Sequence, residues 1–160
     1  MKQFAVTLAT IATLLVGCAS PPGGPSATTT PAGNSVEGLV TALAAAQLDV
    51  RQARVFDPTP LQGRGTLLCV GREEVRVYAF ASDQERAAVT SQIDPTDPSH
   101  IGTSIVEWTG NPRFWQGDRI IVLYLGADPA TETRLTAALG QPFARGVGGG
   151  GLGGPRLSAC

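Results

Sequence analysis

The only histidine of the chain, His100, is the first candidate for acid–base or metal chemistry. Asp94 and Asp97 precede it at intervals of three residues, and Ser99 and Ser104 lie near it in the sequence. A Ser–His–Asp triad needs these groups within hydrogen-bond reach, but the sequence lacks a Gly-x-Ser-x-Gly nucleophile turn. Calcium sites usually have more oxygen ligands, and zinc prefers Cys and His. We therefore expect turn-forming aspartates, a solvated His100, and no metal or cofactor.

Three cysteines, Cys18, Cys69 and Cys160, are the other candidates for nucleophilic or redox chemistry. Cys69 lies in the apolar segment Thr66–Val70, where a small buried thiol is the simplest interpretation. Cys160 is the last residue, whereas a prenylation motif places its cysteine fourth from the end. An oxidising compartment would allow Cys69 and Cys160 to pair, but we expect them to remain unpaired. An enzyme that uses Cys69 or His100 is kept as the alternative to a non-catalytic protein.

The segment Asn111–Gly117 combines Arg113, Phe114 and Trp115, and Trp108 lies close upstream. Arg, Phe and Trp are the side chains most enriched at protein interfaces. We expect a loop here, and we name Trp108, Arg113, Phe114 and Trp115 as candidate binding residues. The alternative is that Phe114 and Trp115 fold back to cap the sheet, and the low aromatic content of 6% slightly favours this arrangement.

The first 18 residues have the features of an export signal. Met1–Lys2 is a short positive start, and Phe4–Val16 is an apolar run. At about 1.5 Å per residue this run reaches roughly 20 Å, which is too short for a hydrocarbon core of about 30 Å. Leu15-Val16-Gly17-Cys18 then resembles the bacterial lipobox. That resemblance implies diacylglyceryl transfer to the Cys18 sulfur and cleavage before Cys18. The alternative is an ordinary secretory signal with an unrelated cysteine.

Composition divides the remaining chain into three parts. The 160 residues carry 12 Lys+Arg and 13 Asp+Glu, a balance that argues against a nucleic-acid partner. Residues 18–35 are rich in Pro, Gly, Ser and Thr and uncharged, so we expect a flexible linker of roughly 20–25 Å. Residues 36–143 contain the folding patterns of one domain. Residues 144–160 are Gly-rich without a phosphate-binding motif, so we expect a disordered tail.

Periodicity and capping residues predict eight elements in the domain. Ser35, Ser82 and Asp128 can each cap a helix, and helical spacing follows each of them. The predicted helices are Val36–Gln47, the segment that Ser82 opens and that runs to about Ile93, and Pro129–Leu139. Five segments are typical of strands: Val50–Phe56, Thr66–Val70, Glu74–Ala81, Thr103–Thr109 and Arg119–Leu125. The apolar run Ile120–Tyr124 suits a central strand covered on both faces, or one whose outer face meets a partner.

The order of these elements is roughly α-β-β-β-α-β-β-α. Short connections between strands favour antiparallel pairing. We therefore expect an α+β fold, with a single two-layer domain whose mainly antiparallel sheet has helices packed on one face. A ferredoxin-like arrangement of part of the domain is compatible with this order, although the order of strands in the sheet is not readable from it.

One extended motif resembles a protein family. It reads Trp108-x-x-x-Pro112-x-Phe114-Trp115-x-Gly117-x-x-Ile120-x-Val122-Leu123-Tyr124-x-Gly126, with Val75-x-Val77-Tyr78-x-Phe80 upstream. Together with the lipobox, the motif is similar to that of small bacterial lipoproteins that have one α+β domain of unknown function. The residue between the Pro and the Phe is often His in that group, whereas this chain has Arg113. The resemblance supports the architecture and implies no activity.

These patterns favour a lipid-anchored protein of the bacterial cell envelope with no catalytic role. Its partners would be the bilayer, through acylated Cys18, and an envelope protein or a small ligand. The absence of Asp after Cys18 favours the periplasmic face of the outer membrane in a double-membraned host. The expected contact surface is the sheet face that the helices leave uncovered, together with Phe114 and Trp115. A structural accessory subunit without a ligand is a third interpretation.

Overall fold

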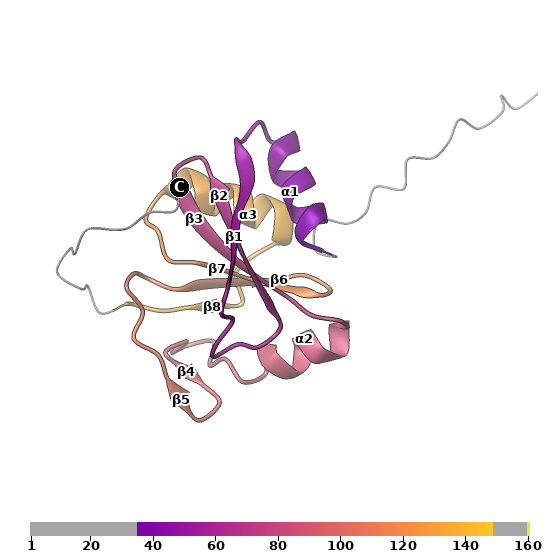
Figure 1. The fold of residues 1–160 in the computed structure, drawn as a ribbon. Coiled ribbons are helices and arrows are strands. Elements are labelled where there is room, and N and C mark those ends of the chain that lie inside the picture. Colours follow the sequence, from indigo (N-terminus) through magenta and orange to yellow (C-terminus); the bar gives the residue numbers. More distant parts are fainter. Residues whose placement is uncertain (1–34, 149–159) are drawn as a thin grey trace, which may run out of the picture.

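The computed structural model describes residues 35–148 and residue 160 (Figure 1). Within these residues the helices are α1 (Val36–Ala45), α2 (Asp83–Thr90) and α3 (Pro129–Leu139). The strands are β1 (Val50–Phe56), β2 (Arg64–Val70), β3 (Glu73–Ala79), β4 (His100–Ile101), β5 (Ser104–Ile105), β6 (Arg113–Gln116), β7 (Ile120–Tyr124) and β8 (Ala144–Arg145). The leader, Cys18, the linker and most of the Gly-rich tail lie outside the described residues.

The strands confirm an α+β fold with an antiparallel sheet. Six strands pair in the order β1-β2-β3-β7-β6-β8, and β4 and β5 form a separate two-stranded ladder. The predicted hairpin of β2 and β3 turns at Gly71-Arg72, where Gly71 has a φ of 60°, a conformation that favours glycine. Two expectations were wrong: 103–109 contributes only the short β5, and 111–117 contains the strand β6.

The helices begin where the capping residues predict. The hydroxyl of Ser35 accepts a hydrogen bond from the Gly38 N–H at 3.1 Å, and that of Ser82 accepts one from the Glu85 N–H at 3.1 Å. The carboxylate of Glu85 in turn accepts from the Ala81 N–H at 2.9 Å, which completes the predicted capping box. Asp128 caps α3 in the same way. The ends of α1 and α2 come two to three residues earlier than predicted.

One face of the sheet is covered by α1 and α3. Leu39 and Leu43 of α1 and Leu135 of α3 are 0–1% exposed. They pack on the sheet residues that point to this side: Leu68, Val70, Val75, Val77, Trp115, Ile120, Val122 and Tyr124. Burying side chains of this size stabilises the fold by about 1.5–3 kcal/mol each.

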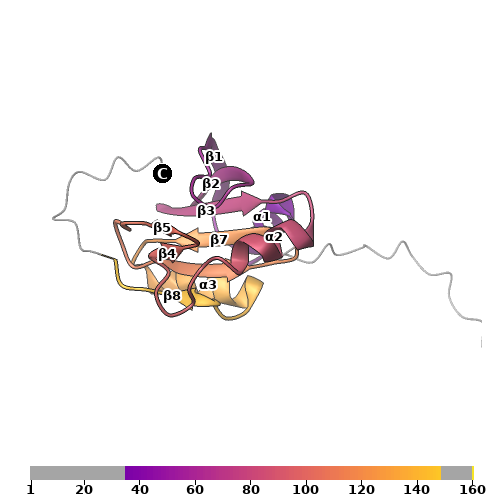
Figure 2. The ribbon, with the colours of Figure 1, turned by 90° about the horizontal axis from the view of Figure 1, so that it is seen from below.

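The opposite face is covered by α2 and by the chain that follows it (Figure 2). Val89 of α2, with Ile93, Ile101 and Trp108, packs on Tyr78, Phe114, Ile121 and Leu123 of the sheet. The helices are therefore not all on one face, because β7 is apolar on both sides and both sides need a cover. Of the two arrangements predicted for Ile120–Tyr124, burial on both faces is confirmed.

This second cover reaches only part of the sheet. Its residues pack on β7, β6 and Tyr78, whereas no residue of α2 or of 93–108 packs with Leu67 or Cys69 of β2 in the described apolar clusters. Figure 2 shows α2, β4 and β5 in front of the sheet with β1 and β2 clear of them. The margin of this face at β1 and β2 is therefore not packed by α2 or by residues 93–108, although Leu67 and Cys69 there are only 1–2% exposed.

Candidate functional site

Phe114 and Trp115 lie in β6, and both side chains are 0% exposed. They pair with Leu123 and Val122 of β7, so they point to opposite faces of the sheet. Phe114 belongs to the cluster under α2, and Trp115 belongs to the cluster under α1 and α3. Neither ring is available to a partner, so their assignment as candidate binding residues is wrong. The alternative that places them in the core agrees with the structure.

Trp108 is also a packing residue, with 6% of its surface exposed. Its indole N–H donates to the Pro98 carbonyl at 3.0 Å, and its ring meets Phe114 edge-on at 5.7 Å. Edge-to-face pairs of this kind stabilise a core beyond their buried area. Trp108 therefore holds the chain after α2 against the sheet, and it offers little surface for binding.

Arg113 is tied down by several acceptors. Its Nε lies 2.9 Å from the Glu132 carboxylate of α3, and its Nη1 donates to the Gly126 carbonyl at 2.9 Å. Glu132 also accepts from Arg145 of β8 at 2.6 Å. A guanidinium committed to a carboxylate and a carbonyl has few donors left for a ligand. The expectation that Arg113 serves binding is therefore replaced by a role in fastening α3 and β8 to the sheet.

A second polar contact at this end of the sheet has no counterpart in the sequence analysis. The Tyr124 hydroxyl donates to Glu73 at 2.7 Å and accepts from the Asp128 N–H at 2.9 Å. Burial and the Glu73 carboxylate raise the pKa of Tyr124 above its ordinary value of 10.0. A phenol that is harder to ionise and has both a donor and an acceptor partner serves as a structural link between β3, β7 and α3.

The stretch from Asp94 to His100 forms turns, as predicted. Asp94 accepts from the Thr96 N–H and hydroxyl at 2.8 Å each, and these bonds lower the pKa of Asp94. The His100 ring lies 2.8 Å from Asp97, and both side chains are more than half exposed. The described contacts of this ring do not include Ser99 or Ser104, so no triad is assembled. Among the described residues no group of three His, Cys, Asp or Glu could hold a metal ion.

Cys69 and Cys160 form a disulfide bond. The two residues are separated by 91 positions, and their Cα atoms are 5.4 Å apart. The expectation that they remain unpaired is therefore wrong. Cys69 is buried, as predicted, but it is 1% exposed as half of a disulfide and not as a free thiol. Sequence spacing could not show this pairing, because the fold alone decides that β2 lies beside the end of the chain.

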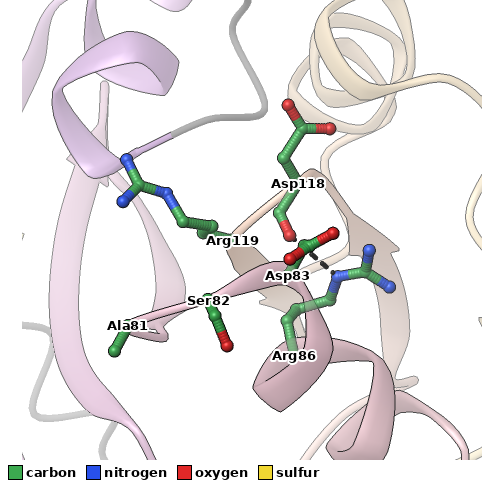
Figure 3. A pocket seen from close by; sticks show the side chains of 6 residues that line it. All are labelled: Ala81, Ser82, Asp83, Arg86, Asp118 and Arg119. Atoms are coloured by element: carbon green, nitrogen blue, oxygen red, sulfur yellow. Dashed lines mark hydrogen bonds between the residues drawn. The ribbon is translucent and has the colours of Figure 1, made fainter.

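A pocket lies where α2 begins, with a volume of about 510 Å³. It is lined by Ala81, Ser82, Asp83, Arg86, Asp118 and Arg119 (Figure 3). The Arg86 guanidinium donates to the Asp118 carbonyl at 3.2 Å and to the Gln116 side chain at 2.9 Å. Ser82 and Glu85 already satisfy the N–H groups of Glu85 and Ala81. With two arginines balanced by two aspartates and its helix end capped, this pocket has no excess charge that would bind an ion.

The margin of the second face at β1 and β2 has a different composition. The pairing of β1, β2 and β3 places the side chains on this side in three cross-strand rows. The first row contains Phe56, Gly65 and Tyr78. The second contains Arg54, Leu67 and Arg76, and the third contains Arg51, Cys69 and Glu74. We call the side chains of these three rows the arginine face. It has three arginines and one carboxylate, and the disulfide joins it at Cys69.

A β-bulge makes this face. Arg51 and Arg54 are three residues apart, so in a regular strand they would point to opposite sides. The register of β1 shifts between Gln52 and Arg54, which leaves Ala53 as the extra residue. Arg51 therefore pairs with Cys69 and Arg54 with Leu67, both on the same side of the sheet. The sequence alone does not reveal that Arg51 and Arg54 share a face, because only the register of β1 with β2 defines the bulge between them.

No protein-family model, no curated protein and no solved structure matches the chain.

Proposed function

We propose that this chain is a lipoprotein of the bacterial cell envelope, anchored through acylated Cys18, whose folded domain is a binding or accessory module without catalysis. The observation that carries the proposal is the disulfide between Cys69 and Cys160. Disulfides of this kind persist in oxidising compartments outside the cytoplasm. An export signal and a disulfide are independent features, and both point to the same side of the membrane.

The described side chains support a non-catalytic role. A cysteine hydrolase would need a free thiolate, but the Cys69 sulfur is bonded to Cys160. An acid–base enzyme would need His100 near a nucleophile, but its ring bonds only to Asp97 in the described contacts. Neither Cys69 nor His100 is therefore placed as the nucleophile or base of an envelope hydrolase.

The binding surface that we propose is the arginine face. The core takes up Phe114 and Trp115, and α1, α2 and α3 cover most of the sheet. On the second side of the sheet, Arg51 and Arg54 of this face are exposed, and Arg76 is half-buried. None of the helices within residues 35–148 is long and apolar enough to cross a bilayer.

Fractionation of a bacterial host that expresses the full chain tests the anchor. We expect the wild-type chain to float with membranes and to be labelled by radioactive palmitate. The Cys18→Ala variant should lose the label, because the sulfur that accepts the diacylglyceryl group is gone. The Cys160→Ala variant is the matched control and should keep it. An unlabelled wild-type chain released in soluble form would favour the ordinary secretory signal instead.

A further inference from the structure

The pocket at the start of α2 has charges of both signs that no described residue neutralises. The Arg119 side chain is exposed and has no ion-pair or hydrogen-bond partner in the described part of the chain. The carboxylates of Asp83 and Asp118 have no such partner among these residues either, because Asp118 accepts from Arg86 only through its main-chain carbonyl. Figure 3 shows the Arg119 guanidinium on one side of the pocket and the two carboxylates on the other. The pocket therefore presents one cation and two anions to a ligand.

Hydrogen bonds between elements hold the walls of this pocket in place. Arg86 of α2 donates through Nε to the Asp118 carbonyl at 3.2 Å and through Nη1 to the Gln116 side chain at 2.9 Å. These bonds join the first turn of α2 to the turn between β6 and β7. The Arg119 carbonyl accepts from the Phe80 N–H at 2.9 Å, which fixes the same turn to the chain that follows β3. Groups that are already in position lose less freedom when a ligand binds, so the pocket is preorganised.

The balance of charge in the pocket selects the kind of ligand. A single ion gains little here, since two aspartates balance two arginines. A zwitterion gains more, because its anionic end can lie on Arg119 while its ammonium lies on Asp83 and Asp118. Sites for small organic ligands have volumes of about 300–1,000 Å³. The volume of about 510 Å³ lies in this range, so the pocket suits a zwitterionic organic molecule.

The anionic end of such a ligand is better matched by a carboxylate than by a phosphate. Phosphate sites usually combine several arginines or the free N–H groups at the start of a helix. Here Arg86 already has two acceptors, and Ser82 and Glu85 cap the first turn of α2. One guanidinium, that of Arg119, forms two parallel hydrogen bonds with one carboxylate. The Ser82 hydroxyl accepts from the Glu85 N–H and still has its own proton to donate.

We propose that this pocket binds an amino acid or short peptide through its free ammonium and its free carboxylate. The carboxylate lies on Arg119 and Ser82, and the ammonium lies on Asp83 and Asp118. This site goes beyond the proposed function, and it depends neither on the lipid anchor nor on the arginine face. Arg119, Asp83 and Asp118 are exposed, so water weakens each ion pair. Removing one charge of the ligand should therefore weaken binding about fivefold.

Equilibrium dialysis of the full chain against radiolabelled alanyl-alanine tests the proposal. Three unlabelled competitors are compared with the unlabelled dipeptide. N-acetyl-alanyl-alanine lacks the ammonium, alanyl-alanine amide lacks the carboxylate, and glycerophosphoethanolamine carries an ammonium with a phosphate. We expect the dipeptide to displace the label at about fivefold lower concentration than either capped analogue. Glycerophosphoethanolamine should also compete less well than the dipeptide.

Arginine footprinting places the bound dipeptide on the protein. Phenylglyoxal labelling of each arginine is read by mass spectrometry with and without a saturating concentration of alanyl-alanine. We expect the dipeptide to slow the labelling of Arg119, because the bound carboxylate covers its guanidinium. Arg64 is exposed and does not line the pocket, so it is the internal control and should label at the same rate in both samples.

Two variants assign the ends of the ligand. Arg119→Gln should bind alanyl-alanine and its amide equally, and it should still prefer the dipeptide to the acetylated form. Asp83→Asn with Asp118→Asn should show the reverse pattern. Arg64→Gln and Glu107→Gln change exposed charges outside the pocket, so they are the matched controls and should keep both preferences. Melting curves verify that each variant is folded, and the wild-type competition decides the question even if a variant unfolds.

Four results would overturn the proposal. Dialysis without saturable binding of alanyl-alanine excludes the site. Equal competition by the dipeptide and both capped analogues means that the two charges are not recognised. Tighter binding of glycerophosphoethanolamine assigns the pocket to a phosphate-containing headgroup instead. Labelling of Arg119 that is unchanged by the dipeptide places any binding elsewhere on the protein.

Discussion

The side chains of Phe114 and Trp115 test how β6 is built into the core. Each ring is fully buried in a different apolar cluster. We predict that Phe114→Ala and Trp115→Ala each lower the free energy of unfolding by about 3–5 kcal/mol, because a large cavity replaces the ring. Urea denaturation followed by circular dichroism measures this loss.

The matched control for these two variants is Ile105→Ala, which truncates a side chain that is 74% exposed. It should change the free energy of unfolding by less than about 0.5 kcal/mol. A change in the free energy of unfolding as small as that of Ile105→Ala for Phe114→Ala or Trp115→Ala would show that the ring is not a core residue. Such a ring would again be a candidate for binding a partner.

Gly65 carries a second prediction at the scale of one residue. It lies in the row between Phe56 and Tyr78, and a Cβ atom at this position would come within 2.9 Å of the Phe56 ring. We predict that Gly65→Val displaces this ring and destabilises the protein by about 1–3 kcal/mol, as overpacking does. Val55→Gly, at an exposed position of β1, is the control, because it measures how exchanging Val and Gly affects the stability of a strand where nothing is packed. Gly71→Val is not used as the control, because Gly71 has a positive φ that valine would strain. Unchanged melting of Gly65→Val would contradict the position of the Phe56 ring.

At the scale of elements, the start of α3 makes stability depend on pH. The hydroxyl and N–H of Thr131 donate to the Asp128 carboxylate at 2.7 and 2.9 Å, and these bonds lower its pKa from the ordinary 3.8. In the unfolded chain the Asp128 carboxylate takes up a proton near pH 3.8, whereas in the folded chain it takes up the proton only at a lower pH. The stability from this carboxylate is therefore complete above pH 3.8 and is lost as the pH falls through the folded pKa.

The Asp128→Asn variant tests this dependence, because Asn can still cap the helix but does not titrate. We predict that the melting temperature of the variant falls less steeply than that of the wild type between about pH 5 and pH 2. Parallel slopes for the two proteins would show that the Asp128 carboxylate does not contribute to acid denaturation.

The elements also show how far the sequence predicts this fold. The capping residues Ser35, Ser82 and Asp128 mark the starts of all three helices within the described residues, and the Gly71 turn marks the hairpin. The strand β6 was missed because Pro112 and Gly117 are typical of a loop, whereas pairing with β7 decides the structure. The bulge at Ala53 was missed for the same reason, since only the register with β2 defines it. Without that bulge, the alternation of a regular strand would place Arg51 and Arg54 on opposite sides of the sheet.

At the scale of the whole molecule, the disulfide joins the last residue of the chain to the sheet. The bond closes a loop whose ends are 91 positions apart. In the chain-entropy model such a loop stabilises the folded state, and removing a native disulfide from a small exported domain costs about 2–5 kcal/mol. We predict that Cys160→Ser lowers the free energy of unfolding by this amount.

Reductant provides the control for this prediction. Dithiothreitol should destabilise the wild-type protein to the level of Cys160→Ser, and it should have no further effect on the variant. Urea curves with and without reductant measure both differences. A wild-type protein whose unfolding is indifferent to reductant would contradict the disulfide and would remove the main support for an oxidising compartment.

The intact mass of the full chain purified from membranes of a bacterial host tests the central claim most directly. The account predicts a mature chain that begins at Cys18, carries the mass of its acyl groups, and is two hydrogens lighter than the form with both Cys69 and Cys160 reduced. A chain that begins at another residue, has no lipid and has two free thiols would contradict it, because it would be neither a lipoprotein nor a resident of an oxidising compartment.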